Sequence, residues 1–391
     1  MGPSYKGLSY CVIVVFNTGE TPYKMEKKMI IEGLGYNDTF AKHRKESNLE
    51  DFEIGRVIAE HKERYIVKSE KGELEAEITG NLRFAAKSRE DFPAVGDWVA
   101  LIDCDSDFAI IHRVLPRVSM LSRQAVGKFG EAQIIAANID FALLVQAVDR
   151  DFNINRLERY LTICFSSKVS PIIVLTKTDL IEPQKLKETI EDIKRRIKNI
   201  PIIPISNETK DGYDSITGII RKGKTYCLLG SSGAGKSTLI NNLSGKNIMK
   251  TNSISTRTNK GRHITSHREL IVLESGGILI DNPGMREIGI IDTAEGSETA
   301  FDIIFNYSKQ CKYSDCTHTG EIGCAVIEAV NRGEIDMRSY ENFLKIEREK
   351  DHFNLTVAEK RKKDKSFGKM VKNFKNDMQK ISTKHKNRYK K

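Results

Sequence analysis

The sequence predicts three parts: an all-β barrel, an α/β core built on a parallel sheet, and a small α-rich domain around a group of metal-binding side chains. Three observations predict this order. Short β-rich runs crowd residues 51–121, apolar strands alternate with helical patterns over residues 122–290, and three cysteines and a histidine cluster soon after. A chain of 391 residues is long enough for two or three domains, so each pattern can correspond to a domain of its own.

The chain opens with a segment, residues 1–50, that we expect to form an N-terminal extension or arm. Residues 9–16 are apolar, but they lack a basic start and a small-residue cleavage site, so we do not interpret them as a signal peptide. Met25 starts a sequence more typical of a natural N-terminus, which leaves open whether residues 1–24 are native. No apolar run reaches about eighteen residues, so we expect no transmembrane helix.

The β-rich region is predicted to form a small closed barrel. Turn-forming residues at 71–72, 80–81 and 93–96 separate the short strand-like runs. Five short strands in one compact region are typical of small barrels. Such barrels often bind oligonucleotides, although a fold does not establish a function by itself. The expected strands are residues 56–59, 64–68, 74–78, 98–103 and 109–114.

The α/β core follows a segment, residues 122–130, that we expect to be a loop. Residues 141–148 and 172–175 are apolar and β-rich, as expected of strands that are buried on both faces. Helical spacing over residues 155–164 and 185–198 separates the strands, which predicts βαβ units and a parallel sheet with helices on both sides. Further strands are expected at residues 202–205, 226–229, 270–273 and 278–280.

A glycine-rich run between a strand and a helix predicts a phosphate-binding loop. The run Gly230-Ser231-Ser232-Gly233-Ala234-Gly235-Lys236-Ser237 fits G-x-x-x-x-G-K-[ST], and Thr238 continues into the helix. Backbone N–H groups and the helix N-terminus would bind the phosphates. Lys236 would neutralise the β- and γ-phosphates and take part in catalysis, and the Ser237 hydroxyl would hold Mg²⁺.

A base-reading motif lies upstream of this loop rather than downstream. The run Thr176-Lys177-Thr178-Asp179 fits [NT]-K-x-D. The Asp179 carboxylate can accept hydrogen bonds from N1–H and the 2-amino group of guanine, donors that adenine lacks. The stem of Lys177 can pack across the base, and Ser206, at the end of the next strand, would support the loop. The sequence therefore predicts a GTP/GDP site with its motifs in circularly permuted order.

The γ-phosphate side of this site is predicted from a D-x-x-G run after an apolar strand. Asp281 would hold Mg²⁺ and the Gly284 N–H would meet the γ-phosphate. A switch threonine is expected between the two motifs to complete the Mg²⁺ coordination. Thr265 is our choice, and Thr256 and Thr258 are the alternatives.

No glutamine follows this run to orient the attacking water, because Met285 takes that place. We therefore expect slow intrinsic hydrolysis that depends on a partner or on another side chain. His263, in the predicted switch loop, is a candidate catalytic residue. A phosphate or RNA contact, or an ordinary surface position, explains this histidine equally well.

A compact group of soft ligands predicts a structural zinc site. Cys311-x₄-Cys316-x-His318-x₅-Cys324 supplies three thiolates and one imidazole, the number that tetrahedral Zn²⁺ takes. All four positions are filled, so the site would serve folding rather than catalysis. The chain has seven cysteines, an odd and scattered set that argues against a disulfide framework and for a reducing compartment.

The charge of the chain is concentrated at its C-terminus. Residues 356–391 hold 14 Lys or Arg and 3 Asp or Glu, a net charge of +11, whereas the whole chain carries +10. A neutral body with a basic tail suggests a polyanionic partner. We expect nucleic acid first, a membrane surface second, and a disordered solubility tail as the alternative without a partner.

Together these motifs resemble the RsgA family of circularly permuted GTPases, which depend on the small ribosomal subunit. The resemblance covers about residues 30–345 and rests on T-K-x-D, G-S-S-G-A-G-K-S, G-R-H-x-T, D-N-P-G-M-R-E and C-x₄-C-x-H-x₅-C, in that order. The usual H-T-T-T run appears here as His263-Ile264-Thr265-Ser266, a departure that keeps the middle threonine. Thr176 in place of the commoner asparagine is frequent in the family.

The resemblance implies an OB-fold barrel over residues 51–121, a circularly permuted P-loop GTPase domain over 122–290 and a zinc-binding domain over 291–355. The basic tail at 356–391 lies beyond the resemblance, and we expect it to be disordered. It implies a cytoplasmic protein that binds the immature 30S subunit and 16S rRNA late in maturation. GTP hydrolysis on docking would drive its release. We further expect a monomer that does not bind membranes.

Two other functions are compatible with these residues. The first is a nucleotide-gated RNA-binding module in which GTP turnover is incidental. The second is a membrane-surface GTPase that uses the basic tail, although no amphipathic anchor or lipidation site supports it.

Overall fold

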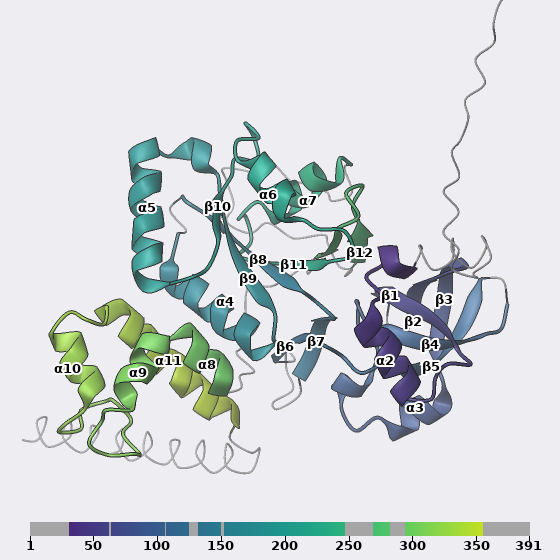
Figure 1. Cartoon of the computed structure of the whole chain (residues 1–391), viewed down its shortest axis with the longest axis horizontal. Coiled ribbons are helices and arrows are strands. Elements are labelled where there is room, and N and C mark those ends of the chain that lie inside the picture. Colours follow the sequence, from purple (N-terminus) through teal and green to yellow (C-terminus); the bar gives the residue numbers. More distant parts are fainter. Residues whose placement is uncertain are drawn as a thin grey trace, which may run out of the picture.

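The computed structural model describes residues 31–61, 64–105, 107–124, 132–149, 152–246, 269–281 and 294–354. A barrel lies on one side of a central α/β sheet, and a group of helices at the C-terminal end of the described chain lies on the other side (Figure 1). Within these ranges no helix has both the length and the apolar character needed to span a membrane.

Five strands close into the predicted barrel. β1 pairs with both β2 and β4, and a parallel pairing of β3 with β5 completes the ring in the order β1-β2-β3-β5-β4. Alternate side chains of β3 are buried inside, which is the period-two pattern of a barrel wall. This closed five-stranded ring confirms the predicted OB-like barrel. Its strands are Glu53–His61 (β1), Arg64–Ser69 (β2), Gly72–Ile78 (β3), Trp98–Asp103 (β4) and Phe108–Val114 (β5).

Short helices pack against this barrel. The helix α2 (Asp38–Glu46) packs Phe40 against the buried Trp98, with ring centroids 5.9 Å apart. Between β3 and β4 the chain forms the helix α3 (Gly80–Ala85) and the 3₁₀ turn η1 (Arg89–Asp91), neither of which the sequence predicted.

The central sheet has the predicted βαβ architecture. Its strands run in the order β10-β9-β8-β11-β13-β12, all parallel except β12. Successive residues of each strand are buried in opposite cores: Leu144 lies with helix α4 on one face, and Leu143 with helices α6 and α7 on the other. The strands are Phe141–Ala147 (β8), Ser170–Thr176 (β9), Ile202–Pro204 (β10), Thr225–Leu229 (β11), Glu269–Val272 (β12) and Ile278–Asp281 (β13).

Helices connect these strands, and a hairpin links the barrel to the sheet. The helices are Ile154–Ser166 (α4), Pro183–Arg196 (α5), Tyr213–Ile219 (α6) and Lys236–Ser244 (α7), with a 3₁₀ turn η2 at Thr178–Leu180. The hairpin pairs β6 (Met120–Gln124) with β7 (Ala132–Ala137). The loop predicted over residues 122–130 is therefore wrong for residues 122–124, because cross-strand pairing to β7 overrides their polar composition.

Four helices form the C-terminal part of the described chain: Ala294–Ala300 (α8), Asp302–Ser308 (α9), Ala325–Asn331 (α10) and Met337–Asn354 (α11). They share a hydrophobic core with α4. A buried carboxylate fixes this contact. Glu158 of α4 accepts hydrogen bonds from Arg196 of α5 at 2.7 and 3.1 Å, and from Ser339 and Asn342 of α11 at 2.7 Å each.

The barrel is joined to the central sheet by strand pairing and by a buried arginine. Ala59 of β1 pairs with Glu269 of β12, so barrel and sheet are continuous. The guanidinium of Arg56, only 1% exposed, donates to the carbonyls of Leu34, Gly96 and Asn138 and to the Thr225 hydroxyl. Burial lowers its pKa to about 10, which leaves it charged at neutral pH. Arg56 thus connects the barrel to the start of the strand that leads into the P-loop.

Candidate nucleotide-binding site and metal centre

The predicted nucleotide-binding motifs meet at one edge of the central sheet. Three strand pairings align the carboxyl ends of neighbouring strands: Ala147 with Thr176, Leu144 with Leu229, and Cys227 with Ile280. The P-loop, the T-K-x-D motif and Asp281 therefore follow neighbouring strand ends. In open parallel sheets this edge is where ligands bind.

The P-loop joins β11 to α7, as its sequence predicts. A Cβ at Gly230 would lie 2.2 Å from the carbonyl oxygen of Val145, so no larger residue fits beside β8. Gly235 has φ +87°, and a Cβ there would lie 2.6 Å from the amide nitrogen of Asn207. The Lys236 ammonium lies over the loop and donates to the carbonyls of Gly230 and Ser231 at 2.7 Å each. Ser237 and Thr238 follow on the first turn of α7.

The T-K-x-D segment contacts the P-loop directly. The Thr176 hydroxyl donates to the carbonyl of Ala234 at 2.7 Å and is fully buried. Lys177 has a left-handed backbone, with φ +60°, and its ammonium pairs with Asp149 at 2.7 Å. Asp149 follows the end of β8 and was not identified from the sequence. The base motif and the phosphate loop therefore pack directly against each other.

Ser206 supports the predicted guanine-reading carboxylate. Its hydroxyl donates to Asp179 Oδ1 at 2.6 Å, and its oxygen accepts from the backbone N–H groups of Glu208 and Thr209 at 3.2 and 3.1 Å. These bonds hold one carboxylate oxygen of Asp179 in place and fix the orientation of its side chain. The structure thus brings together the pair that the sequence analysis proposed.

A second set of contacts, which we call the Tyr213 network, links the base side to the helix that follows the P-loop. The Tyr213 hydroxyl donates to Asn207 Oδ1 at 2.7 Å and accepts from the Asn242 amide at 2.7 Å. Asn207 in turn donates to the carbonyl of Gly235 at 3.2 Å. Burial raises the pKa of the Tyr213 hydroxyl, which keeps it protonated as a donor. Sequence reasoning missed these residues; only Asn207, next to Ser206, carried a positional signal.

On the γ-phosphate side, the structure places Asp281 at the end of β13, with its side chain 5% exposed. Carboxylate and hydroxyl oxygens such as those of Asp281 and Ser237 are donors that Mg²⁺ accepts. The remaining predicted residues on this side lie outside the described part of the chain: Thr256, Thr258, His263, Thr265, Gly284 and Met285.

The predicted zinc ligands converge in the C-terminal helical part. The donor atoms of Cys311, Cys316, His318 and Cys324 all lie within 4.8 Å of one another. His318 Nδ1 is 3.6 Å from the sulfur of Cys311 and 3.5 Å from that of Cys324, and these two sulfurs are 3.9 Å apart. Tetrahedral bonds of about 2.0–2.3 Å place ligand atoms about 3.3–3.8 Å apart, so the donor set fits Zn²⁺.

The loop between these ligands is held by the side chain of Glu321. Its carboxylate accepts from the backbone N–H groups of Thr317, Thr319 and Gly320 at 2.9, 2.8 and 3.1 Å, and hydrogen bonds from Thr317 hold its pKa well below the usual range. The Tyr340 hydroxyl of α11 donates to the His318 carbonyl at 2.5 Å. Burial lowers the pKa of His318, which favours the neutral, metal-binding imidazole. The four ligands are thus already arranged to bind zinc.

Two family models match the chain. One, described as RsgA GTPase, matches residues 114–291. The other, described as a 50S ribosome-binding GTPase, matches residues 225–373. Both matches include the P-loop.

Curated relatives match most of the chain. The protein of Bacteroides thetaiotaomicron named small ribosomal subunit biogenesis GTPase RsgA 1 is 39% identical over 343 residues, which are 87% of this chain and 95% of that protein. The protein of Lactiplantibacillus plantarum named small ribosomal subunit biogenesis GTPase RsgA 2 is 42% identical over 318 residues, which are 81% of this chain and 89% of that protein.

Two solved structures share the fold. YjeQ from Thermotoga maritima is 26% identical, with a TM-score of 0.57 over 76% of this chain and 98% of that one. YloQ, described as a circularly permuted GTPase, is also 26% identical, with a TM-score of 0.56 over 79% of this chain and 98% of that one. The circular permutation that the motif order predicts is thereby confirmed.

Proposed function

The chain belongs to the RsgA family of GTPases, and on this premise we propose that it binds the immature small ribosomal subunit and hydrolyses GTP there. The observation that carries the proposal is the direct contact between the base motif and the phosphate loop. Because Thr176 and Asn207 both donate to P-loop carbonyls, one nucleotide can engage both motifs at once. The chain is therefore a GTP hydrolase with its motifs in permuted order.

We propose the following division of roles within the site. The P-loop, from Gly230 to Thr238, binds the phosphates, and Asp179 reads the base with support from Thr176, Lys177, Thr178 and Ser206. Ser237 and Asp281 hold Mg²⁺, which supplies charge neutralisation at the β- and γ-phosphates when bound. Thr265 completes the metal site, Gly284 meets the γ-phosphate, and His263 orients water; these three lie outside the described residues.

The zinc centre has a structural role in this proposal. Zinc on Cys311, Cys316, His318 and Cys324 holds the segment between α9 and α10 against α11. We propose that this domain, together with the barrel, binds 16S rRNA, as the names of the relatives suggest for small-subunit biogenesis. The protein would act as a monomer in the cytoplasm, where the subunits are matured.

Nucleotide-dependent docking tests this function. The GTP-bound form would favour the docked state, and hydrolysis would favour release. Sedimentation of the full chain with purified small subunits should recover more protein with a non-hydrolysable GTP analogue than with GDP. Equal recovery with both nucleotides would contradict a GTP-controlled docking cycle.

The second candidate is a nucleotide-gated RNA-binding module in which turnover is incidental. Met285 favours it, because an apolar side chain after D-x-x-G cannot orient the attacking water. The two candidates differ in whether the subunit accelerates hydrolysis.

A further inference from the structure

One aromatic side chain of the barrel domain is almost fully exposed to solvent. Phe84, on the short helix α3, is 95% exposed, more than any other large apolar side chain among the described residues. The half-buried Leu82 packs α3 against the barrel core, and Thr79 caps the helix by accepting from the Leu82 N–H at 3.1 Å. The helix is therefore anchored while Phe84 faces solvent. A single exposed apolar residue is common and needs no explanation by itself.

Exposed cations lie close to this aromatic residue in the sequence. Arg83, Lys87 and Arg89 are all exposed within the same connection between β3 and β4. The carboxylate of Asp91 stabilises the backbone of this connection, since it accepts hydrogen bonds from the N–H groups of Lys87 and Ser88 at 2.8 and 2.9 Å. An aromatic face beside several cations is the combination that binds single-stranded nucleic acid.

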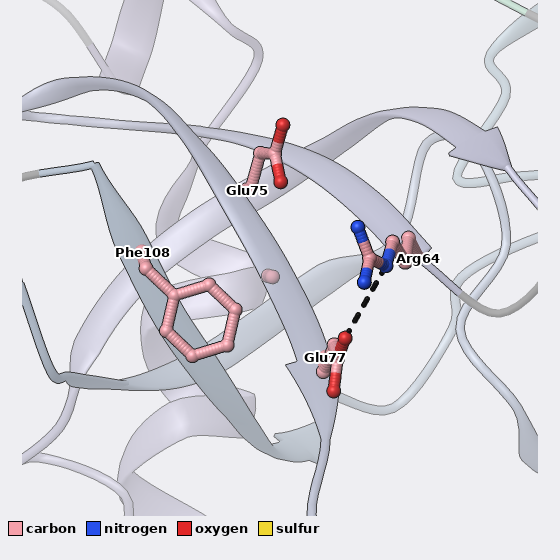
Figure 2. A pocket seen from close by; sticks show the side chains of 5 residues that line it. Arg64, Glu75, Glu77 and Phe108 are labelled. Atoms are coloured by element: carbon pink, nitrogen blue, oxygen red, sulfur yellow. Dashed lines mark ion pairs between the residues drawn. The ribbon is translucent and has the colours of Figure 1, made fainter.

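Another part of the barrel surface is acidic. A hollow of about 240 Å³ is lined by Arg64, Glu75, Glu77 and Phe108, whose side chains are drawn in Figure 2. It also has an aromatic side chain, but Arg64 is paired with Glu77 at 3.4 Å and Glu75 adds a further negative charge. Lys68, nearby on β2, is likewise paired with Glu73, at 3.0 Å. An acidic surface repels a phosphate backbone, so this face is unsuited to RNA.

We propose that the barrel binds single-stranded RNA through the connection over residues 80–91, with Phe84 stacked on an unpaired base and Arg83, Lys87 and Arg89 at the phosphates. The segment lies at the lower end of the barrel in Figure 1, away from the nucleotide site. The inference rests on the proposed function, which makes RNA the partner, and it assigns the surface that binds it. Charge complementarity and the exposed aromatic ring both favour RNA over a protein or a lipid surface.

Substitutions in the full chain test this surface. The probes are a fluorescent oligouridylate of about twelve nucleotides and purified small subunits. Phe84→Ala should weaken oligouridylate binding by about 5- to 150-fold, the effect of losing one stacked base, and Phe84→Trp should restore it. Replacing Arg83, Lys87 and Arg89 together by alanine should lower the slope of log affinity against log salt by about 2.

Phe108→Ala is the matched control, because it removes an aromatic ring from the acidic hollow of the same barrel. It should leave oligouridylate binding unchanged. GTP affinity should stay at the wild-type value in all the variants, since none of the substituted residues belongs to the nucleotide-binding motifs. The thermal midpoint should stay at the wild-type value in Phe84→Ala, because the Phe84 side chain is 95% exposed.

Three outcomes would overturn the inference. Wild-type RNA affinity in Phe84→Ala and in the triple variant would remove this surface from RNA binding. An equal loss of RNA affinity in Phe108→Ala would show that RNA binding is not specific to the connection over residues 80–91. Loss of binding to vesicles containing phosphatidylserine, with RNA binding intact, would assign the surface to a membrane. If instead the wild-type chain bound neither small subunits nor RNA, the proposed function would fail together with this inference.

Discussion

In the proposed site, guanine recognition depends on how the Asp179 carboxylate is held. Ser206 fixes one oxygen of Asp179 at 2.6 Å, so the direction of the side chain is set before a base arrives. The sequence identified both residues because the T-K-x-D motif and the following strand end have recognisable patterns. It could not identify Asp149, which pairs with Lys177, because one aspartate after a strand carries no pattern.

Asp179→Asn tests this residue. The amide can no longer accept both guanine donors, so we expect GTP affinity to fall by about 10- to 150-fold and preference to shift to xanthine nucleotides. Titration with fluorescent GTP and xanthosine triphosphate measures both effects. Asp211→Asn is the control, since that exposed carboxylate bonds Thr209 within the same loop. Unchanged GTP affinity in Asp179→Asn would remove this residue from the base site.

The Tyr213 network gives a second prediction at this scale. Tyr213→Phe removes the hydroxyl that joins Asn207 to Asn242 and keeps the ring, so nucleotide affinity should fall by about two- to twelvefold. Tyr226→Phe is the control. Its hydroxyl bonds the Ile219 carbonyl and the Arg221 N–H instead, so this change should lower the thermal midpoint without altering nucleotide affinity. Equal nucleotide affinities in the two variants would mean that the network has only a structural role.

At the scale of elements, the local patterns were sufficient for the strands of the barrel and of the central sheet and for α4 and α5, because these segments have strong apolar periodicity. They were insufficient for the hairpin strands β6 and β7, and likewise for α3 and α6, which are short and have few buried side chains. The continuity of barrel and sheet through β1 and β12 was also unpredictable, since the paired residues are far apart in the sequence. The burial of Arg56 was also unpredictable, because the carbonyls that accept its hydrogen bonds belong to segments distant in the sequence.

Removal of the proposed zinc centre should have the clearest effect among the elements. Cys316→Ser removes one of four ligands, so we expect loss of bound zinc and a decrease of more than about 3 kcal/mol in the free energy of unfolding. Metal analysis and thermal unfolding of the same sample measure both. Cys104→Ser, at an exposed position outside the cluster, should keep one zinc per chain and wild-type stability. Full stability without zinc in Cys316→Ser would contradict a structural metal.

At the scale of the whole molecule, two buried polar groups hold the outer parts to the central sheet. Arg56 fixes the barrel, and Glu158 fixes the C-terminal helices. A buried charge without partners is costly, so each group favours one arrangement of its neighbours.

Glu158→Ala leaves Arg196 buried without its carboxylate, so we expect the free energy of unfolding to fall by about 3–5 kcal/mol. Asp192→Ala breaks an exposed pair with Arg195 on the same helix, α5, and should cost less than about 1 kcal/mol. Chemical denaturation gives both values. Similar costs for the two variants would mean that the Glu158 contacts do not stabilise the junction.

In the proposed function, the small ribosomal subunit activates this GTPase. The most direct test is the rate of GTP hydrolysis by the full chain, measured with and without purified small subunits and with large subunits as the control. We predict an increase of at least about tenfold with small subunits, equivalent to ~1.4 kcal/mol of the barrier, and none with large subunits. An unchanged rate with small subunits would contradict the account and favour the RNA-binding module in which turnover is incidental.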